Sequence, residues 1–205
     1  MATSDKEDGI MDALGALRQD LARYGFPLCD QAWANICDNA VVGRAPNRAI
    51  LLDSVNISSA WVFVASGFAA SCYTHQNGRQ SLTRFFEAGH WAGNVSSTWS
   101  QDYGSDELIA VGDVSYVTVP HQFLLAQYMQ HDGFGAYIRL KVIETLRYDK
   151  DLLVCQALND PEARFRFVQD RHPELLDVAL KKDIAAFLGV TPQGYSRFLR
   201  RRMGT

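Results

Sequence analysis

The sequence predicts an α+β fold in three successive parts: an N-terminal antiparallel β-roll, a long helix and a C-terminal helix-turn-helix. Short runs rich in β-branched and aromatic residues follow one another between residues 49 and 119. Apolar residues then recur at helical intervals, and two short helical patterns separated by a glycine end the chain. These observations place the three predicted parts at 1–120, 121–158 and 159–205.

Composition favours a folded protein that does not span a membrane. The chain has 205 residues, of which 47% are hydrophobic, and this is enough to bury a sizeable core. No run reaches the roughly 18 apolar residues of a membrane span. The first residues are polar and acidic and do not form a cationic leader. We therefore expect a cytoplasmic location.

The cysteines and histidines show no metal-binding pattern. Cys29, Cys37, Cys72 and Cys155 form no C-x-x-C pair and have no ligand spacing with the five histidines. Reduced, mostly buried thiols are therefore expected, and no metal site is predicted. Because no glycine-rich phosphate loop and no recognised hydrolase motif occurs, no catalytic residue is predicted and an enzyme is the least favoured function class.

The first part begins with helices and continues with strands. Residues 11–39 have a helical pattern with a break at 25–27. Strands are expected at 49–52, 61–64, 68–73, 81–86, 107–111 and 114–119. Asn77-Gly78 offers the positive φ angles of a hairpin loop. The core of the roll is expected to contain Trp61, Phe63, Phe85, Phe86 and Trp91.

A helix is expected over 122–130, and a long one over 137–158. Apolar residues recur along the long helix at Ile138, Val142, Leu146 and Leu153. Such a stripe needs a partner, which is either the sheet or a second copy of the same helix. After this helix, Asp160 is expected to cap a further helix that Pro161 opens and that extends over 162–169.

The C-terminal residues have the pattern of a helix-turn-helix. Ile184, Ala185 and Leu188 fall on one helical face, and Gly189 lies where that helix would end. Val190 is a small apolar residue that suits the corner between the two helices. Thr191 is expected to be the N-cap of the second helix, and Pro192 its first residue. In the second helix, Tyr195, Phe198 and Leu199 can face the body of the domain. The positions that project toward a DNA groove are Gln193, Ser196, Arg197 and Arg200.

The net charge of −3 hides an asymmetry between the two ends of the chain. Residues 171–205 contain seven Lys or Arg and three Asp or Glu, which gives +4, so residues 1–170 carry −7. A basic segment on an acidic body suits a polyanionic partner that meets this segment alone.

The order of these parts resembles the Crp/Fnr superfamily of bacterial transcription regulators, which includes the cyclic AMP receptor protein. Residues 61–70 resemble the family's strand-glycine-strand hairpin, and 86–93 its second glycine pair. Leu188-Gly189-Val190-Thr191-Pro192, followed by Tyr195-Ser196-Arg197, resembles the start of the family's recognition helix. The resemblance covers about residues 30–202. It implies a cyclic-nucleotide-binding-like roll of the double-stranded β-helix or jelly-roll type that senses an effector, and a long dimerisation helix.

The resemblance also implies partners and site residues. Double-stranded DNA, a second copy of the chain and RNA polymerase are the implied partners, and the small-molecule effector is unknown. Arg197 matches an arginine that commonly contacts a base edge, and a guanidinium suits guanine O6 and N7. The implied DNA-binding residues are Thr191, Gln193, Tyr195, Ser196, Arg197, Arg200 and Arg201.

Departures from the family pattern argue against the known cofactors. Asn94 follows Gly93 where cyclic-nucleotide binders have a glutamate, and 103–107 offers acids where they have a phosphate-binding arginine. Cyclic AMP binding is therefore not expected. Cys29 and Cys37 are too few for an iron–sulfur cluster, and the lone His90 does not indicate haem. A pocket for another effector would be lined by Trp91, Gly93, Asn94, Ser96, Ser97 and Ser105.

The chain ends three residues after Arg202, where most relatives continue into a two-stranded wing, so we expect no full wing. Phosphate contacts would then come from Lys181, Lys182, Arg200, Arg201 and Arg202. Two function classes stay open: a homodimeric regulator that reads a palindromic site, and a ligand-sensing or protein-interaction module of the same fold without specific DNA binding.

Overall fold

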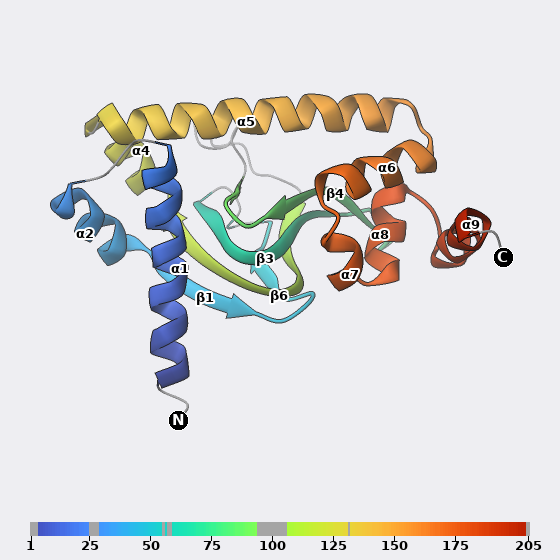
Figure 1. The fold of residues 1–205 in the computed structure, drawn as a ribbon, viewed down its shortest axis with the longest axis horizontal. Helices are drawn as coiled ribbons and strands as arrows, with labels where there is room; N and C mark the ends of the chain where they lie inside the picture. Colours follow the sequence, from blue (N-terminus) through green and yellow to red (C-terminus); the bar gives the residue numbers. More distant parts are fainter. Residues whose placement is uncertain are drawn as a thin grey trace.

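The computed structural model describes residues 4–24, 29–54, 56, 59–93, 106–130 and 132–203. Its helices are α1 (Ser4–Arg23), α2 (Asp30–Asn39), α4 (His121–Gln130), α5 (Asp132–Ala157), α6 (Pro161–Arg171), α7 (Leu175–Val178), α8 (Lys181–Leu188) and α9 (Pro192–Met203). Its strands are β1 (Val41–Ala45), β2 (Ile50–Leu52), β3 (Ala60–Thr74), β4 (Gln80–Glu87), β5 (Trp91–Ala92) and β6 (Asp106–Pro120). This is the predicted α+β architecture (Figure 1).

Two long strands form the centre of an antiparallel sheet. β3 and β6 pair from Ala60 opposite Pro120 to Tyr73 opposite Asp106. β1 and β2 pair with β6, and β4 and β5 pair with β3. Each long strand contains two of the expected strands, because irregularities in the pairing, including shifts between Val64 and Phe68, interrupt its regular pattern without ending it.

Gly67 makes this irregularity possible. Its φ is +78°, and a Cβ added there would lie 2.2 Å from the carbonyl oxygen of Asp113 on β6. A larger residue would therefore meet both a strained backbone and a steric clash.

The structure differs from the sequence-based expectations at two short strands, at the loop between β3 and β4, and at the start of α5. The residue pattern does not predict β1, an edge strand, or β5, which has only two residues. In the loop between β3 and β4 only Gly78 has a positive φ, so Asn77 does not form the two-residue turn that the pair suggested. α5 begins five residues earlier than expected, because glycines at 133 and 135 weaken the helical pattern. The expected break at 25–27 lies outside the described residues.

Alternate residues of β3 contribute to different cores. Val62 and Val64 pack inside the roll, whereas Trp61 and Phe63 pack with residues of α1, α4 and α5. After the irregularity, Phe68 joins a third core that contains residues of α6, α8 and α9. All five aromatic residues expected in the core of the roll are buried, but only Phe86 packs inside the roll. Trp91, like Trp61 and Phe63, packs with α1, α4 and α5, and Phe85 packs with the C-terminal helices, so that prediction is correct only in part.

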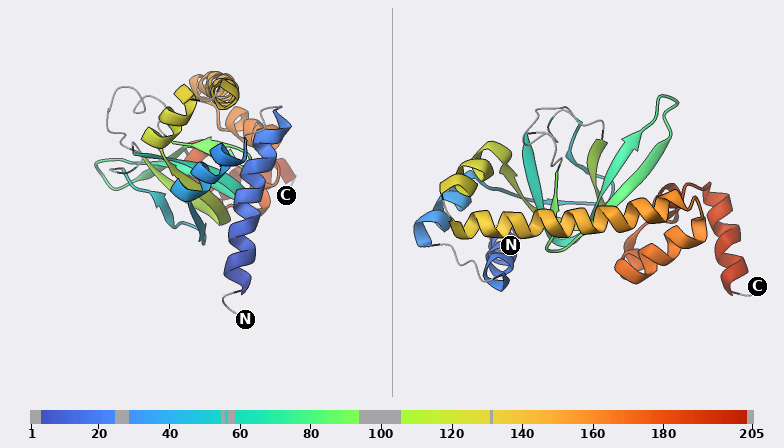
Figure 2. Two further views of the ribbon diagram at one scale, coloured as in Figure 1. Left: turned by 90° about the vertical axis from the view of Figure 1, so that its left-hand side faces the viewer. Right: turned by 90° about the horizontal axis from the view of Figure 1, so that it is seen from above.

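α5 runs along most of the length of the molecule, with α2 and α9 lying beyond its two ends (Figure 2). α1, α2 and α4 lie at one end, and α6, α7, α8 and α9 lie at the other (Figure 1). The predicted boundaries at 120 and 158 stay predictions, but the C-terminal helices do share a core with β3 and β4. Within the described ranges, no helix is long and apolar enough to cross a membrane.

The cysteines follow the expectation in part. All four are free, and Cys72 and Cys155 are buried. Cys37 is half-buried and Cys29 is exposed, so only two of the four thiols belong to the core.

Replacing Phe187 by Ala tests whether the C-terminal helices and the sheet share one core. The Phe187 ring lies 4.9 Å from that of Phe85 on β4. We expect a loss of about 3–5 kcal/mol in the free energy of unfolding, because the change leaves a cavity between α8 and the sheet. Urea denaturation measures it, with Met129→Ala at a 76% exposed position as control. Equal stability of the two variants would contradict the shared core.

Candidate nucleic-acid interface

The turn between α8 and α9 is built by three consecutive local signals. Gly189 ends α8 in the left-handed conformation with φ 73°, and the N–H of Val190 donates to Ala185 O at 3.0 Å. Thr191 Oγ1 accepts a hydrogen bond from the N–H of Gly194 at 3.0 Å. Pro192 then begins α9. The predicted helix-turn-helix is confirmed as local geometry.

Gly194 fits this turn closely. A Cβ at Gly194 would lie 3.2 Å from Thr191 Oγ1 and 3.6 Å from the Val190 Cβ. The glycine therefore lets the capping hydroxyl approach the first turn of α9, which accounts for a residue that otherwise lowers helix stability.

The inner face of α9 packs against α6. Tyr195 and Phe198 are buried, with ring centroids 6.4 and 5.2 Å from that of Phe165. Tyr195 is only 4% exposed, so its ring belongs to the core. The inclusion of Tyr195 among the DNA-binding residues is therefore corrected, and the prediction that it faces the body of the domain is confirmed.

The outer face of α9 presents polar and cationic side chains. Gln193, Ser196, Arg197 and Arg200 are exposed and lie opposite Tyr195 and Phe198 around the helix. The Ser196 hydroxyl donates to Pro192 O at 3.0 Å, so its donor is already used. Thr191 is exposed, with its hydroxyl engaged as the cap.

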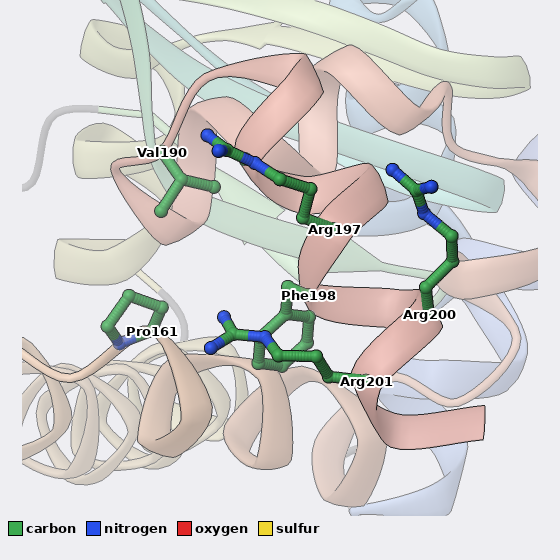
Figure 3. Close-up of a pocket in the computed structure, with 7 residues that line it drawn as sticks. Pro161, Val190, Arg197, Phe198, Arg200 and Arg201 are labelled. Atoms are coloured by element: carbon green, nitrogen blue, oxygen red, sulfur yellow. The ribbon is translucent and has the colours of Figure 1, made fainter. Parts of the chain in front are cut away.

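A groove with an apolar floor runs beside this outer face (Figure 3). Its volume is about 620 Å³. We call it the arginine groove, and it is lined by Pro161, Val190, Gly194, Arg197, Phe198, Arg200 and Arg201. Within the part of the chain that the structure describes, none of its arginines forms an ion pair with a carboxylate. The groove therefore has positive charge that no described residue of the chain neutralises.

Arg202 differs from the neighbouring arginines. Its guanidinium pairs with Glu162, bonds Gln169 Oε1 at 3.4 Å and lies 4.7 Å from the centroid of the Phe165 ring. Arg202 thus ties α9 to α6, and its expected role as a phosphate contact stays a prediction that would require this ion pair to break or be shared. The spacing of Tyr195, Phe198 and Arg202 already places Arg202 on the inner face of α9.

Polar contacts hold the C-terminal helices on the roll. Arg48, in the turn before β2, bonds the buried Asp183 of α8 at 2.9 Å. His172, just after α6, lies 2.9 Å from Glu87 Oε2 on β4 and 2.9 Å from the Tyr148 hydroxyl on α5. The hydrogen bond from His172 lowers the pKa of Glu87, whereas burial raises the pKa of Asp183. Sequence reasoning misses these contacts, because each joins residues at least 24 positions apart.

Only part of the expected effector pocket can be placed. Asn94, Ser96, Ser97 and Ser105 lie outside the described residues. Trp91 is buried, and its indole N–H donates to the Tyr137 hydroxyl at 2.8 Å, so this donor is already used within the fold. A Cβ at Gly93 would lie 3.0 Å from the Trp61 ring, which explains the glycine as a packing residue.

Trp91 belongs to a buried polar network that joins the roll to two helices. The Tyr137 hydroxyl donates to Asp20 Oδ2 of α1 at 2.6 Å. Lys141 of α5 bonds Asp20 at 2.8 Å and the carbonyl oxygen of Gly89 at 3.0 Å. Burial raises the pKa of Tyr137, so it stays a neutral donor. Over the described ranges, no group of three His, Cys, Asp or Glu side chains is arranged to hold a metal ion.

Solved structures share this arrangement. A chain from Eubacterium rectale, described as a transcriptional regulator of the Crp/Fnr family, matches with a TM-score of 0.64 over 85% of this chain and 83% of its own, at 14% identity. FixK2 from Bradyrhizobium japonicum matches with a TM-score of 0.63 over 80% and 86%, at 17% identity. The c-di-GMP-responsive global regulator CLP from Xanthomonas campestris matches with a TM-score of 0.58 over 86% and 92%, at 14% identity.

The chain therefore has the fold of Crp/Fnr-type regulators, with a cyclic-nucleotide-binding-like roll. At these identities the likeness shows the fold alone. No protein-family model and no curated protein matches the sequence.

Replacing Thr191 by Ala tests the local origin of the turn. We expect a loss of about 1 kcal/mol in the free energy of unfolding, because the N–H of Gly194 loses its side-chain acceptor. Thr191→Ser keeps the hydroxyl and should stay near wild-type stability. Thermal and urea denaturation provide the measurement, and an alanine variant as stable as the serine variant would show that the cap is dispensable.

Proposed function

We propose that the chain is a homodimeric transcription regulator of the Crp/Fnr type that reads a palindromic DNA site. The observation that carries this proposal is the outer face of α9, where arginines that pair with no carboxylate among the described residues project from a helix-turn-helix. A helix of this kind, held out from its domain, fits the major groove of duplex DNA.

Base reading is assigned to the side chains that point straight out from α9. Arg197 has a planar guanidinium that can bond guanine O6 and N7 together, and Gln193 can read adenine. Ser196 and Arg200 lie on the same outer face. Arg201 lines the arginine groove, and Lys181 and Lys182 are exposed at the start of α8, so these three suit phosphate contacts.

The proposed dimer uses a second apolar face of α5. One face of α5, with Tyr137, Tyr148 and Leu152, is buried against the rest of the chain. The opposite face carries an apolar stripe of exposed side chains: Leu140, Ile143, Leu146, Leu153 and Val154. A helix that is apolar on both faces needs a second partner, and a second copy of α5 supplies a matching stripe. Two related α9 helices would then reach half-sites about 34 Å apart.

The proposal includes no cyclic AMP and no catalytic step. The acids at 103–107 and Asn94 argue against a cyclic phosphate, so another effector, or none, acts on the roll. Such a regulator acts in the cytoplasm, and contact with RNA polymerase stays a prediction. The alternative function is a ligand-sensing or interaction module of the same fold that does not bind DNA specifically.

Selection of bound duplexes from a random pool tests the proposal, with and without cyclic AMP or cell extract. The wild-type protein should select a palindrome, and cyclic AMP should leave its affinity unchanged. Arg197→Ala should relax the preference at one position of each half-site by about 1–3 kcal/mol, because a bidentate contact to a base is lost. Arg201→Ala should lower the affinity for all DNA sequences by the same factor and reduce the salt dependence of binding. Equal wild-type affinity for every sequence would favour the interaction module.

Replacing Leu153 by Glu tests the dimer. Leu153 is 67% exposed on the apolar stripe, and the two-fold arrangement would bring two glutamates together in an apolar seam. We expect this variant to sediment as a monomer while the wild type sediments as a dimer. Met129→Glu on α4 is the matched control and should stay dimeric. A dimeric Leu153→Glu variant would place the interface elsewhere.

A further inference from the structure

Arg164 joins the end of α5 to the turn of the helix-turn-helix. It lies in the second turn of α6, with Nη1 donating to Leu188 O at 3.2 Å and Nη2 donating to Gln156 O at 3.3 Å. Leu188 is the last residue of α8, and Gln156 lies in the last turn of α5. One planar cation therefore contacts the C-terminal ends of two helices, where free carbonyl groups and the helix dipoles favour positive charge.

The turn is shaped to admit this guanidinium. Gly189 has φ 73°, and a Cβ there would lie 2.8 Å from Arg164 Nη1. Arg164 keeps its place although its Nε is buried without a hydrogen-bond partner. The contacts of its two terminal nitrogens must offset that cost.

α6, α8 and α9 otherwise form one packed unit. Phe165 of α6 contacts Tyr195 and Phe198, and Arg202 ties α9 to Glu162. Residues 158–160 are the chain link between α5 and α6, and Asn159 among them has a φ of 48°. The two helices also touch where the Tyr148 and Phe167 rings lie 5.4 Å apart and where Arg171 pairs with Asp151. Arg164 reaches back across the link to Gln156, so its contacts add to those that constrain the angle between α5 and the unit that carries α9.

We propose that Arg164 is a positioning residue that sets the half-site spacing the protein accepts. This inference rests on the proposed function, in which α5 is the dimer seam and α9 reads DNA. If the angle between the two helices is fixed, the two α9 helices of a dimer stand at one separation and one rotation. Each added base pair displaces the second half-site by about 3.4 Å and turns it by about 35°, so a fixed angle penalises a wrong spacing.

The test uses the full-length protein and duplexes built from the half-site that the wild type selects. One set varies the spacing by one or two base pairs in each direction, and one duplex carries a single half-site. Arg164→Gln removes the cation and the fork of donors. Arg164→Lys keeps the charge but replaces the fork with one ammonium group, which cannot span both carbonyl groups in the same way. Arg166→Gln, at an exposed position of the same helix, is the matched control for the change of charge.

The wild type and Arg166→Gln should bind one spacing best. Both Arg164 variants should bind that spacing about tenfold more weakly, tolerate neighbouring spacings, and keep their affinity for the single half-site within about twofold. A variant that merely unfolds would lose the single half-site as well. Gly189→Asn provides a second route, because Asn tolerates the left-handed conformation while its Cβ displaces the guanidinium. It should show the same broadened spacing profile.

The outcomes separate the two proposals. If the wild type shows no preference for paired half-sites, the proposed function fails, and this inference fails with it. If the wild type has a sharp optimum that the Arg164 and Gly189 variants keep unchanged, the positioning role is overturned and the regulator assignment stands.

Discussion

The structure depends on the packing of the C-terminal helices against the outer face of β3 and β4. Phe85 and Phe187 meet there, and the same core includes Phe68, Leu175 and Tyr195. Burial of these large apolar side chains is the dominant favourable contribution to holding the two parts together. Since α9 packs on α6 through this core, the direction in which its arginines point is set by the sheet as well as by the turn. The orientation of the outer face of α9 is therefore a property of the whole chain.

The arginines of the C-terminal part divide by whether the chain supplies their partner. Arg202 pairs with Glu162, and Arg164 bonds two carbonyl groups, so each is already bound within the fold. A cation with an internal partner would have to give up that partner before it could bind a phosphate. Arg197, Arg200 and Arg201 have no such cost, because no described carboxylate pairs with them. The positive charge free to meet a polyanion is thus smaller than the run of arginines suggests, and it is concentrated on one side of α9.

Local signals predicted the elements, and long-range contacts supplied what they missed. Gly189, Thr191 and Pro192 act within a few residues of their own positions, so the turn could be read from the sequence. The bonds from Arg202 to Glu162 and from Arg48 to Asp183 join residues 40 and 135 positions apart, and no periodicity encodes such pairs. β3 and β6 each join two of the expected strands through a stretch of irregular pairing. Such a stretch interrupts the alternation of apolar and polar residues, so the sequence pattern predicts two short strands there. Of the expected DNA-binding residues, only Tyr195 is buried, and its helical spacing with Phe198 shows why.

α5 is the element on which the separate parts converge. Near its start, Tyr137 and Lys141 bond Asp20 of α1 and the turn at Gly89 and Trp91, which leads into the residues expected to meet an effector. Near its end, Gln156 accepts the bond from Arg164, while the apolar stripe lies on the face of α5 opposite Tyr148 and Leu152. A helix is stiff over such a length, because each turn is bonded to the next. A displacement of the roll relative to α5 would therefore involve the whole helix, including its apolar stripe. The buried network around Asp20 opposes such a displacement, since breaking it would leave charged groups without partners in an apolar setting. An effector that displaced the roll against α5 would therefore have to break these contacts of Asp20 and Lys141.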